Sequence, residues 1–313
     1  MGTPEFAVPS LQILLENGYN IVGVITAPDK PAGRGQQLNE SPVKKFAKKN
    51  NLTILQPEKL KAPEFIQELE SLKVNLQVVV AFRMLPKIVW DMPEYGTFNL
   101  HASLLPQYRG AAPINWAVIN GEEKSGITTF FIEEEIDTGK VIFQEEVQIN
   151  ESQTAGELHD ILMEKGAGLV LKTVNAINNN EHQATDQLHI AKTVEELKPA
   201  PKIFKDNCKV DWNKPLNHVY NLIRGLSPYP AAWSEIKSKD GKTLSFKIYQ
   251  SNKIIEDHNH PSGFVLTDYK KYIKIAVPGG YIDITTLQLA GKKRMSVEEF
   301  LRGFQNIGDY TVV

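Results

Sequence analysis

Two mainly apolar segments in the first half of the chain constrain the fold most. Ile21–Thr26 and Val74–Phe82 lack polar/apolar alternation, which is the pattern of parallel strands covered on both faces. Helical segments separate them: Ser41 followed by Pro42 signals a helix start, and Pro63–Leu72 gathers its apolar residues on one helical face. This alternation predicts a doubly wound, Rossmann-like α/β domain.

The amino end raises a question about the first strand. The chain begins with a turn, Met1–Pro4, that leads into a helix predicted over Ala7–Asn17. A parallel sheet of this kind normally has an apolar strand just before such a turn. We therefore expect about ten further residues upstream in the native protein, and a sheet that lacks one strand if the protein starts at Met1.

The second half predicts a different domain. Residues 187–202 are mixed and end in a Pro-Ala-Pro-Lys stretch, which we interpret as a linker between a catalytic domain over 1–186 and a domain over 203–313. A helix over Leu216–Arg224 then precedes five short alternating strands, at 234–239, 243–249, 263–267, 272–277 and 281–289. Asp240-Gly241 marks a hairpin turn between the first two. Five such strands favour a small OB-like antiparallel β-barrel.

The charge is uneven along the chain. Residues 1–202 hold 19 basic and 26 acidic residues, whereas 203–313 hold 16 and 11. A basic second domain indicates a polyanionic partner, but a lysine-rich solvated surface explains the balance equally well. No apolar stretch approaches the roughly 20 residues that cross a bilayer, so we expect a protein without membrane contact. We also expect a cytoplasmic location and a monomer.

The candidate catalytic residues lie at predicted strand ends. Asn99 and His101 are two apart, so at the end of a strand both side chains project from one face, where ligands of open α/β sheets gather. An amide donor beside an imidazole suits acyl transfer, and a histidine bonded within a core is the alternative. Asp137 closes the apolar segment 127–137 just before Gly139, where its carboxylate can point back at the sheet end. An ordinary turn former is the alternative there.

These residues belong to motifs that resemble the folate-dependent formyltransferases. Besides Asn99, His101 and Asp137, the matching motifs are Gly2–Phe6, Ser103–Pro106 and Tyr108–Pro113. Asp29–Gly35 and Gly291–Met295 resemble the enzymes of that family that act on methionyl-tRNA, and the resemblance spans nearly the whole chain. It implies transfer of the formyl group of 10-formyltetrahydrofolate to the amino group of methionine on initiator methionyl-tRNA, in translation initiation.

The resemblance also implies roles for individual residues. Asn99 would donate to the oxyanion, His101 would support the charge or shuttle the proton, and Asp137 would orient the imidazole. Neither a metal nor a covalent enzyme intermediate is required. The folate pocket would be lined by Phe82, Arg83, Met84, Leu85, Ser103, Leu104, Leu105 and Pro106. Arg83 stands where the family usually has glycine, and a glycine accepts a positive φ that arginine resists.

For the tRNA, the resemblance implies two cationic sets. The first is a loop, Lys30–Gly35, in which Lys30 and Arg34 would meet the acceptor end. The second lies in the basic domain and comprises Arg224, Lys292, Lys293 and Arg294. Solvated surface residues are the alternative for both sets.

Two other functions remain open at this stage. One is a folate-dependent formyltransferase that acts on an amino sugar nucleotide, against which the cationic loop and the basic domain argue. The other is a non-enzymatic RNA-binding protein on the same scaffold, against which the joint presence of Asn99, His101 and Asp137 argues.

Overall fold

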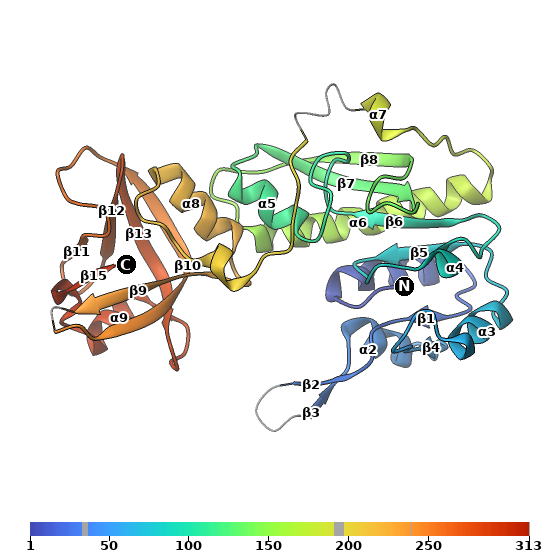
Figure 1. Ribbon diagram of the computed structural model, residues 1–313, viewed down its shortest axis with the longest axis horizontal. Coiled ribbons are helices and arrows are strands. Elements are labelled where there is room, and N and C mark those ends of the chain that lie inside the picture. The colour runs from blue at the N-terminus through green and yellow to red at the C-terminus, as the bar shows by residue number, and fades with distance from the viewer. Residues whose placement is uncertain (33–36, 191–196, 239, 313) are drawn as a thin grey trace. The chain divides into compact units, whose positions relative to one another are not determined.

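The computed structural model describes residues 1–32, 37–190, 197–238 and 240–312 of the chain. It divides into two compact units (Figure 1). Unit 1 comprises Met1–Gly110, Ser125–Val147 and His159–Ala200, and unit 2 comprises Ala111–Lys124, Gln148–Leu158 and Pro201–Val313. The predicted domain boundaries stay predictions beside this division. Across the described residues, no helix combines the length and the apolarity needed to span a bilayer.

Unit 1 contains the α/β sheet that was predicted. Four strands pair in the order β5 (Gln77–Val80), β6 (Thr97–His101), β7 (Lys124–Phe131) and β8 (Val141–Gln148). β5 and β6 run parallel, and β6 and β7 antiparallel. Two more strands, β1 (Val24–Ile25) and β4 (Ile54–Leu55), form a separate parallel pair. The doubly wound, Rossmann-like class is thereby confirmed.

Helices accompany these strands, including the three that the sequence predicted before residue 75. They are η1 (Glu5–Ala7), α1 (Val8–Glu16), α2 (Pro42–Lys49), α3 (Pro63–Ser71), α4 (Lys87–Trp90), α6 (Ala155–Asn178) and α7 (Gln187–Ile190). Ser41 caps α2, because its Oγ accepts a hydrogen bond from Lys44 N at 3.1 Å, and Pro42 occupies the first turn. α6 packs on β7, where Thr173 Oγ1 lies 2.8 Å from Thr129 Oγ1. A hairpin of β2 (Lys30–Ala32) and β3 (Gln37–Asn39) follows β1.

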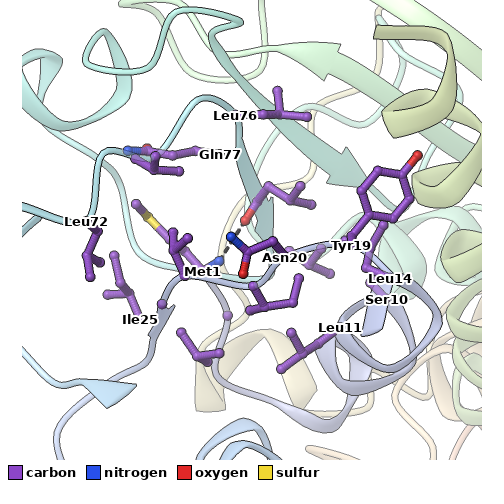
Figure 2. Close-up of a pocket in the computed structure, with 18 of the residues that line it drawn as sticks. Met1, Ser10, Leu11, Leu14, Tyr19, Asn20, Ile25, Leu72, Leu76 and Gln77 are labelled. Carbon is purple, nitrogen blue, oxygen red and sulfur yellow. Dashed lines mark hydrogen bonds between the residues drawn. The ribbon is translucent and has the colours of Figure 1, made fainter. Parts of the chain in front are cut away.

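Within the described ranges, Met1 and Gly2 join β1 to β5. Gly2 N donates to Ile25 O at 3.0 Å, and Val80 N donates to Met1 O at 2.9 Å. Beside them lies a cavity of about 410 Å³, lined on both sides by residues that precede β1 and β5 (Figure 2). The sheet is therefore interrupted at this point, whereas β5 to β8 are continuous.

Unit 2 is built around an antiparallel sheet. The strands pair in the order β11 (Val265–Thr267), β12 (Ile273–Val277), β13 (Gly280–Leu289), β10 (Thr243–Ile255), β9 (Ala232–Ser238) and β15 (Tyr310–Val312), and β14 (Met295–Ser296) pairs with β13. Val312 N donates to Gly263 O at 3.2 Å, which brings the two edges of the sheet together. The remaining elements are α5 (Pro113–Ile119), α8 (Leu216–Gly225), α9 (Val297–Gly303), η3 (Lys205–Cys208) and η4 (Ile307–Asp309). The nearly closed barrel confirms the OB-like prediction.

Candidate active site

The central strand β6 positions the first two candidate residues. It lies between two partners, so that Asn99 is opposite Val79 of β5 and Phe130 of β7. Asn99 and His101 alternate with Leu100 and therefore share one face of the sheet, as predicted. His101 is only 6% exposed, whereas Asn99 is half-buried. Among the described residues the Asn99 amide makes no hydrogen bond, so its N–H groups are free to meet a ligand.

Both ring nitrogens of His101 have defined surroundings. Nε2 lies 2.9 Å from the backbone O of Tyr108, and since a carbonyl only accepts, this nitrogen carries the hydrogen. Nδ1 faces Asp137, with 3.7 Å between Nδ1 and Oδ2. Nδ1 is therefore the atom at which His101 gains or loses a proton, and a carboxylate stands beside it.

Asp137 reaches this position from a turn. The expectation that it closes the strand is wrong, because β7 ends at Phe131, whose N donates to Lys140 O on the returning chain at 3.0 Å. Asp137 itself has a φ of 55°, and its Oδ2 accepts a hydrogen bond from Gly110 N at 2.9 Å. A Cβ on Gly139 would lie 1.8 Å from Phe131 O, so only glycine fits there.

The loop that supplies Tyr108 and Gly110 is held by the segment expected to be a linker. Tyr108 N donates to Lys198 O at 2.7 Å, and Ala200 N donates to Arg109 O at 2.8 Å. Gly110 has a φ of 127°, and a Cβ there would lie 2.4 Å from Ala200 O. Residues up to Ala200 thus belong to unit 1 and shape the loop behind His101.

Gln187 is a residue of this site that sequence reasoning missed. Its side chain is buried, and its Nε2 donates to the backbone O of Asp137 at 2.9 Å and of Gly139 at 2.8 Å. Its Oε1 accepts from Nη2 of Arg109 at 2.6 Å. Gln187 therefore ties the Asp137 turn to the loop after β6. Its neighbourhood in the sequence is polar and irregular, so no local pattern identifies it.

The predicted folate residues after β6 are engaged in internal contacts. Ser103 Oγ donates to Gln107 O at 2.6 Å, and Leu105 N donates to Thr128 Oγ1 at 3.1 Å. Leu105 is buried in a cluster with Phe130, and Pro106 is buried as well, whereas Leu104 is half-buried. This loop is therefore held by contacts within unit 1, and its contact with folate stays a prediction.

The predicted folate residues after β5 divide into exposed and buried ones. Met84 is 70% exposed. Leu85 is buried in a hydrophobic cluster, and the partly buried Phe82 packs against that cluster. The positive φ of this loop, 47°, falls on Ala81 and not on Arg83. Arg83 takes an ordinary conformation, and its guanidinium donates to Glu58 O at 2.8 Å. The arginine at this position therefore causes no backbone strain.

The predicted tRNA contacts have different surroundings. Lys30 is exposed at the start of β2, and Arg34 lies outside the described residues. Lys292 and Lys293 are exposed in unit 2, where the Arg294 guanidinium stands over the Tyr249 ring at 4.2 Å.

Arg224 is buried within unit 2. Its exposed fraction is 6%, and its Nη1 donates to the backbone O of Gln153 at 2.9 Å. Its Nε donates to Asn221 Oδ1 at 2.8 Å, and burial lowers the pKa of the guanidinium. These bonds hold the guanidinium inside unit 2, and its predicted contact with tRNA stays a prediction.

Within the described ranges, no group of three or more His, Cys, Asp or Glu side chains is placed to hold a metal ion. The expected absence of a metal stays a prediction.

Comparison with known protein families identifies both parts of the chain. Residues 1–174 match the family described as formyl transferase, and residues 202–305 match the formyl transferase C-terminal domain.

Two relatives match over almost the whole chain. A protein of Bacteroides thetaiotaomicron named methionyl-tRNA formyltransferase is 59% identical over 305 residues, which cover 97% of this chain and 94% of the relative. A protein of the same name from Parabacteroides distasonis is 56% identical over 313 residues, which cover 100% of this chain and 97% of the relative.

Solved structures share the fold at lower identity. WlaRD, a sugar 3N-formyl transferase solved in the presence of dTDP and 5-N-formyl-THF, is 24% identical with a TM-score of 0.63, covering 93% of this chain and 97% of its own. HypX from Aquifex aeolicus in complex with tetrahydrofolic acid is 19% identical with a TM-score of 0.58, covering 82% of this chain and 43% of its own.

Proposed function

This chain belongs to the formyl transferase family, and on that premise we propose that it formylates the methionine amino group of initiator methionyl-tRNA in translation initiation. The two relatives that match it over nearly their full lengths carry the name methionyl-tRNA formyltransferase. The formyl donor in this proposal is 10-formyltetrahydrofolate. We further propose that the enzyme works as a monomer in the cytoplasm.

The observation that carries the proposed chemistry is the fixed arrangement at the end of β6. The free Asn99 amide and the His101 imidazole share one face, and the Asp137 carboxylate stands 3.7 Å from Nδ1. Hydrogen bonds to backbone groups hold both His101 and Asp137 in this arrangement. Donors and dipoles held in place in this way stabilise charge that develops in a transition state.

The reaction exchanges one carbon–nitrogen bond for another. The methionine amine attacks the formyl carbon, and the carbonyl oxygen acquires negative charge that the Asn99 N–H groups stabilise. His101 Nδ1 accepts the proton that the amine loses, and the Asp137 carboxylate stabilises the resulting imidazolium. When the bond between the formyl carbon and N10 of tetrahydrofolate breaks, the imidazolium returns this proton to N10. Charge and protons balance without an enzyme-bound acyl group.

For the folate, the proposal uses the ends of β5 and β6. Met84 is an exposed apolar side chain after β5, next to the partly buried Phe82, and offers a surface for an aromatic ring. Polar contacts would come from backbone groups of two segments. These are Arg83 and Leu85 after β5, and Ser103, Leu104, Leu105 and Pro106 after β6.

For the tRNA, the proposal uses Lys30 and Arg34 in unit 1 and Lys292, Lys293 and Arg294 in unit 2. Lys292 and Lys293 are exposed, as phosphate contacts must be. Replacing both with alanine should reduce the slope of log affinity against log salt by about 2, since each phosphate contact contributes roughly 0.9. Alanine at the exposed pair Lys270 and Lys271 of the same unit is the matched control.

The proposed function is tested by comparing formyl acceptors. Radiolabelled formyl from 10-formyltetrahydrofolate is offered with charged initiator methionyl-tRNA, uncharged tRNA or an amino sugar nucleotide. Label on the charged tRNA alone is the expected result. Label on the sugar alone would keep the chemistry and replace the substrate, and the absence of label on every acceptor would contradict the enzymatic function.

A further inference from the structure

The β2–β3 hairpin joins the rest of unit 1 through Asp29, before β2, and Glu40, after β3. Figure 1 shows the two strands extending away from α2 and β1. Their pairing begins with Lys30 opposite Asn39, directly beside these two acidic residues. A two-stranded hairpin is only marginally stable by itself, so its direction depends on how its two ends are held.

Lys44 of α2 contacts both ends of this hairpin. Its Nζ forms a hydrogen-bonded ion pair with Oδ2 of Asp29, and it lies 3.6 Å from Oε1 of Glu40. The Lys44 side chain is only 15% exposed, and those of Asp29 and Glu40 are 21% and 29% exposed. Ion pairs that are partly shielded from water are weakened less by solvent and salt than fully exposed ones. One ammonium group therefore links the residue before β2 to the residue after β3.

Further contacts hold the two carboxylates in place. Nε2 of Gln56, which follows β4, donates to Asp29 Oδ1 at 3.0 Å, and Nζ of Lys48 donates to Glu40 Oε1 at 2.8 Å. The hydrogen bond from Lys44 lowers the pKa of the Asp29 carboxyl. The one from Lys48 lowers the pKa of the Glu40 carboxyl. Both ends of the hairpin therefore carry a negative charge at neutral pH, where lysine is protonated.

The helix that carries Lys44 is itself seated on the core of unit 1. Val43 and Ala47, which flank Lys44 on α2, are buried. Ser41 Oγ, which caps the helix, lies 2.8 Å from Oγ1 of Thr26, the residue after β1. The place of the Lys44 backbone is thus set by the core and not by the hairpin.

We propose that Lys44 is a positioning residue for methionyl-tRNA: its ammonium group aims the β2–β3 hairpin and does not itself contact a phosphate. This inference rests on the proposed function, in which Lys30 of β2 contacts the tRNA. Because the Lys44 ammonium lies between two carboxylates, its charge is already neutralised locally and attracts a phosphate weakly. Lys45, the next residue of α2, is exposed and offers the comparison.

Three variants of the full enzyme separate this role from a direct contact. Lys44→Met should raise KM for methionyl-tRNA about tenfold, with kcat and KM for 10-formyltetrahydrofolate changed by less than about twofold. Lys45→Met removes the same charge from the same helix, and as the matched control it should change KM by less than about twofold. Asp29→Asn removes a negative charge, so simple attraction of phosphates would lower KM, whereas loss of the hairpin contact should raise it at least about threefold.

Amide hydrogen exchange gives a readout that does not depend on catalysis. The amides of β3 should exchange at least about fivefold faster in Lys44→Met than in Lys45→Met, because one support of the hairpin is gone. Lys44→Arg keeps a cation between the two carboxylates and should restore most of both the protection and the KM.

The other outcomes decide against the proposal. Unchanged exchange of β3 in Lys44→Met would overturn it, because the hairpin would not depend on the ammonium group. Equal rises in KM for Lys44→Met and Lys45→Met, with a lower KM for Asp29→Asn, would show direct attraction of the tRNA and overturn it as well. Faster exchange with an unchanged KM would overturn the link between the hairpin and the tRNA. An unchanged enzyme that formylates no methionyl-tRNA would overturn the proposed function itself, and the exchange readout would still show whether Lys44 holds the hairpin.

Discussion

Two parts of the same sheet in unit 1 differ in how their polar groups are satisfied. At the end of β6, the His101 ring, the Asp137 carboxylate and the Gln187 amide each bond to a backbone partner. At the cavity between β1 and β5, Ser10 Oγ and Gln77 Nε2 have none. The comparison teaches that the residues proposed for catalysis are held by the part of the sheet whose strands pair continuously, and that the interrupted part lies one strand away, beyond β5.

Replacing the catalytic amide should give the largest effect. Asn99→Ala removes the proposed oxyanion donors and should lower kcat by at least about a hundredfold, with little loss of tRNA binding. Single-turnover transfer and tRNA binding are measured on the same preparation, with Asn178→Ala, an exposed asparagine at the end of α6, as control. An equal loss of kcat and of tRNA affinity would contradict the catalytic assignment of Asn99.

Removing the residue that links the turn to the loop should have a smaller effect. Gln187→Leu leaves the carbonyls of Asp137 and Gly139 without their donor, so Asp137 should shift relative to His101. We expect kcat to fall on the order of tenfold to a hundredfold, KM to change little, and the pH profile of kcat to move.

The neighbouring Leu188 offers the control for this variant. It is 67% exposed on the same short helix, and Leu188→Ala should leave kcat and the pH profile unchanged. If Gln187→Leu changed only the thermal midpoint, Gln187 would stabilise the fold without positioning Asp137.

The smallest effect should come from the unpaired Gln77 amide at the cavity between β1 and β5. Gln77→Met removes the donor that has no partner, while Thr97 Oγ1 keeps its bond to Trp90 O at 2.6 Å. The free energy of unfolding should change by less than about 1 kcal/mol, in the stabilising direction. A loss of 2 kcal/mol or more, by urea unfolding, would show that Nε2 has a partner in solution.

Local patterns predicted several of the elements. Ser41-Pro42 marks the start of α2, where Ser41 Oγ accepts a hydrogen bond from Lys44 N. Asp240-Gly241 marks the turn between β9 and β10. Such signals act within a few residues, so a sequence displays them directly.

The rest of the site depends on contacts between distant segments. Asn99 and His101 were predictable because they share a strand, but Gln187 lies 50 residues from Asp137 in the sequence. Tyr108 contributes its backbone carbonyl, which every residue has, so its side chain does not identify it as part of the site. The end of β7 at Phe131 was misjudged because apolar composition continues to Ile132, whereas the pairing of Phe131 with Lys140 already turns the chain.

Amide hydrogen exchange in the unmodified chain tests the contrast between the two parts of the sheet most directly. The account predicts that the amides of Ile25 and Val78, which line the cavity between β1 and β5, exchange at least about a hundredfold faster than that of Leu100 in the middle of β6. Equal protection of all three amides would show that this cavity is closed in solution, and would contradict the account.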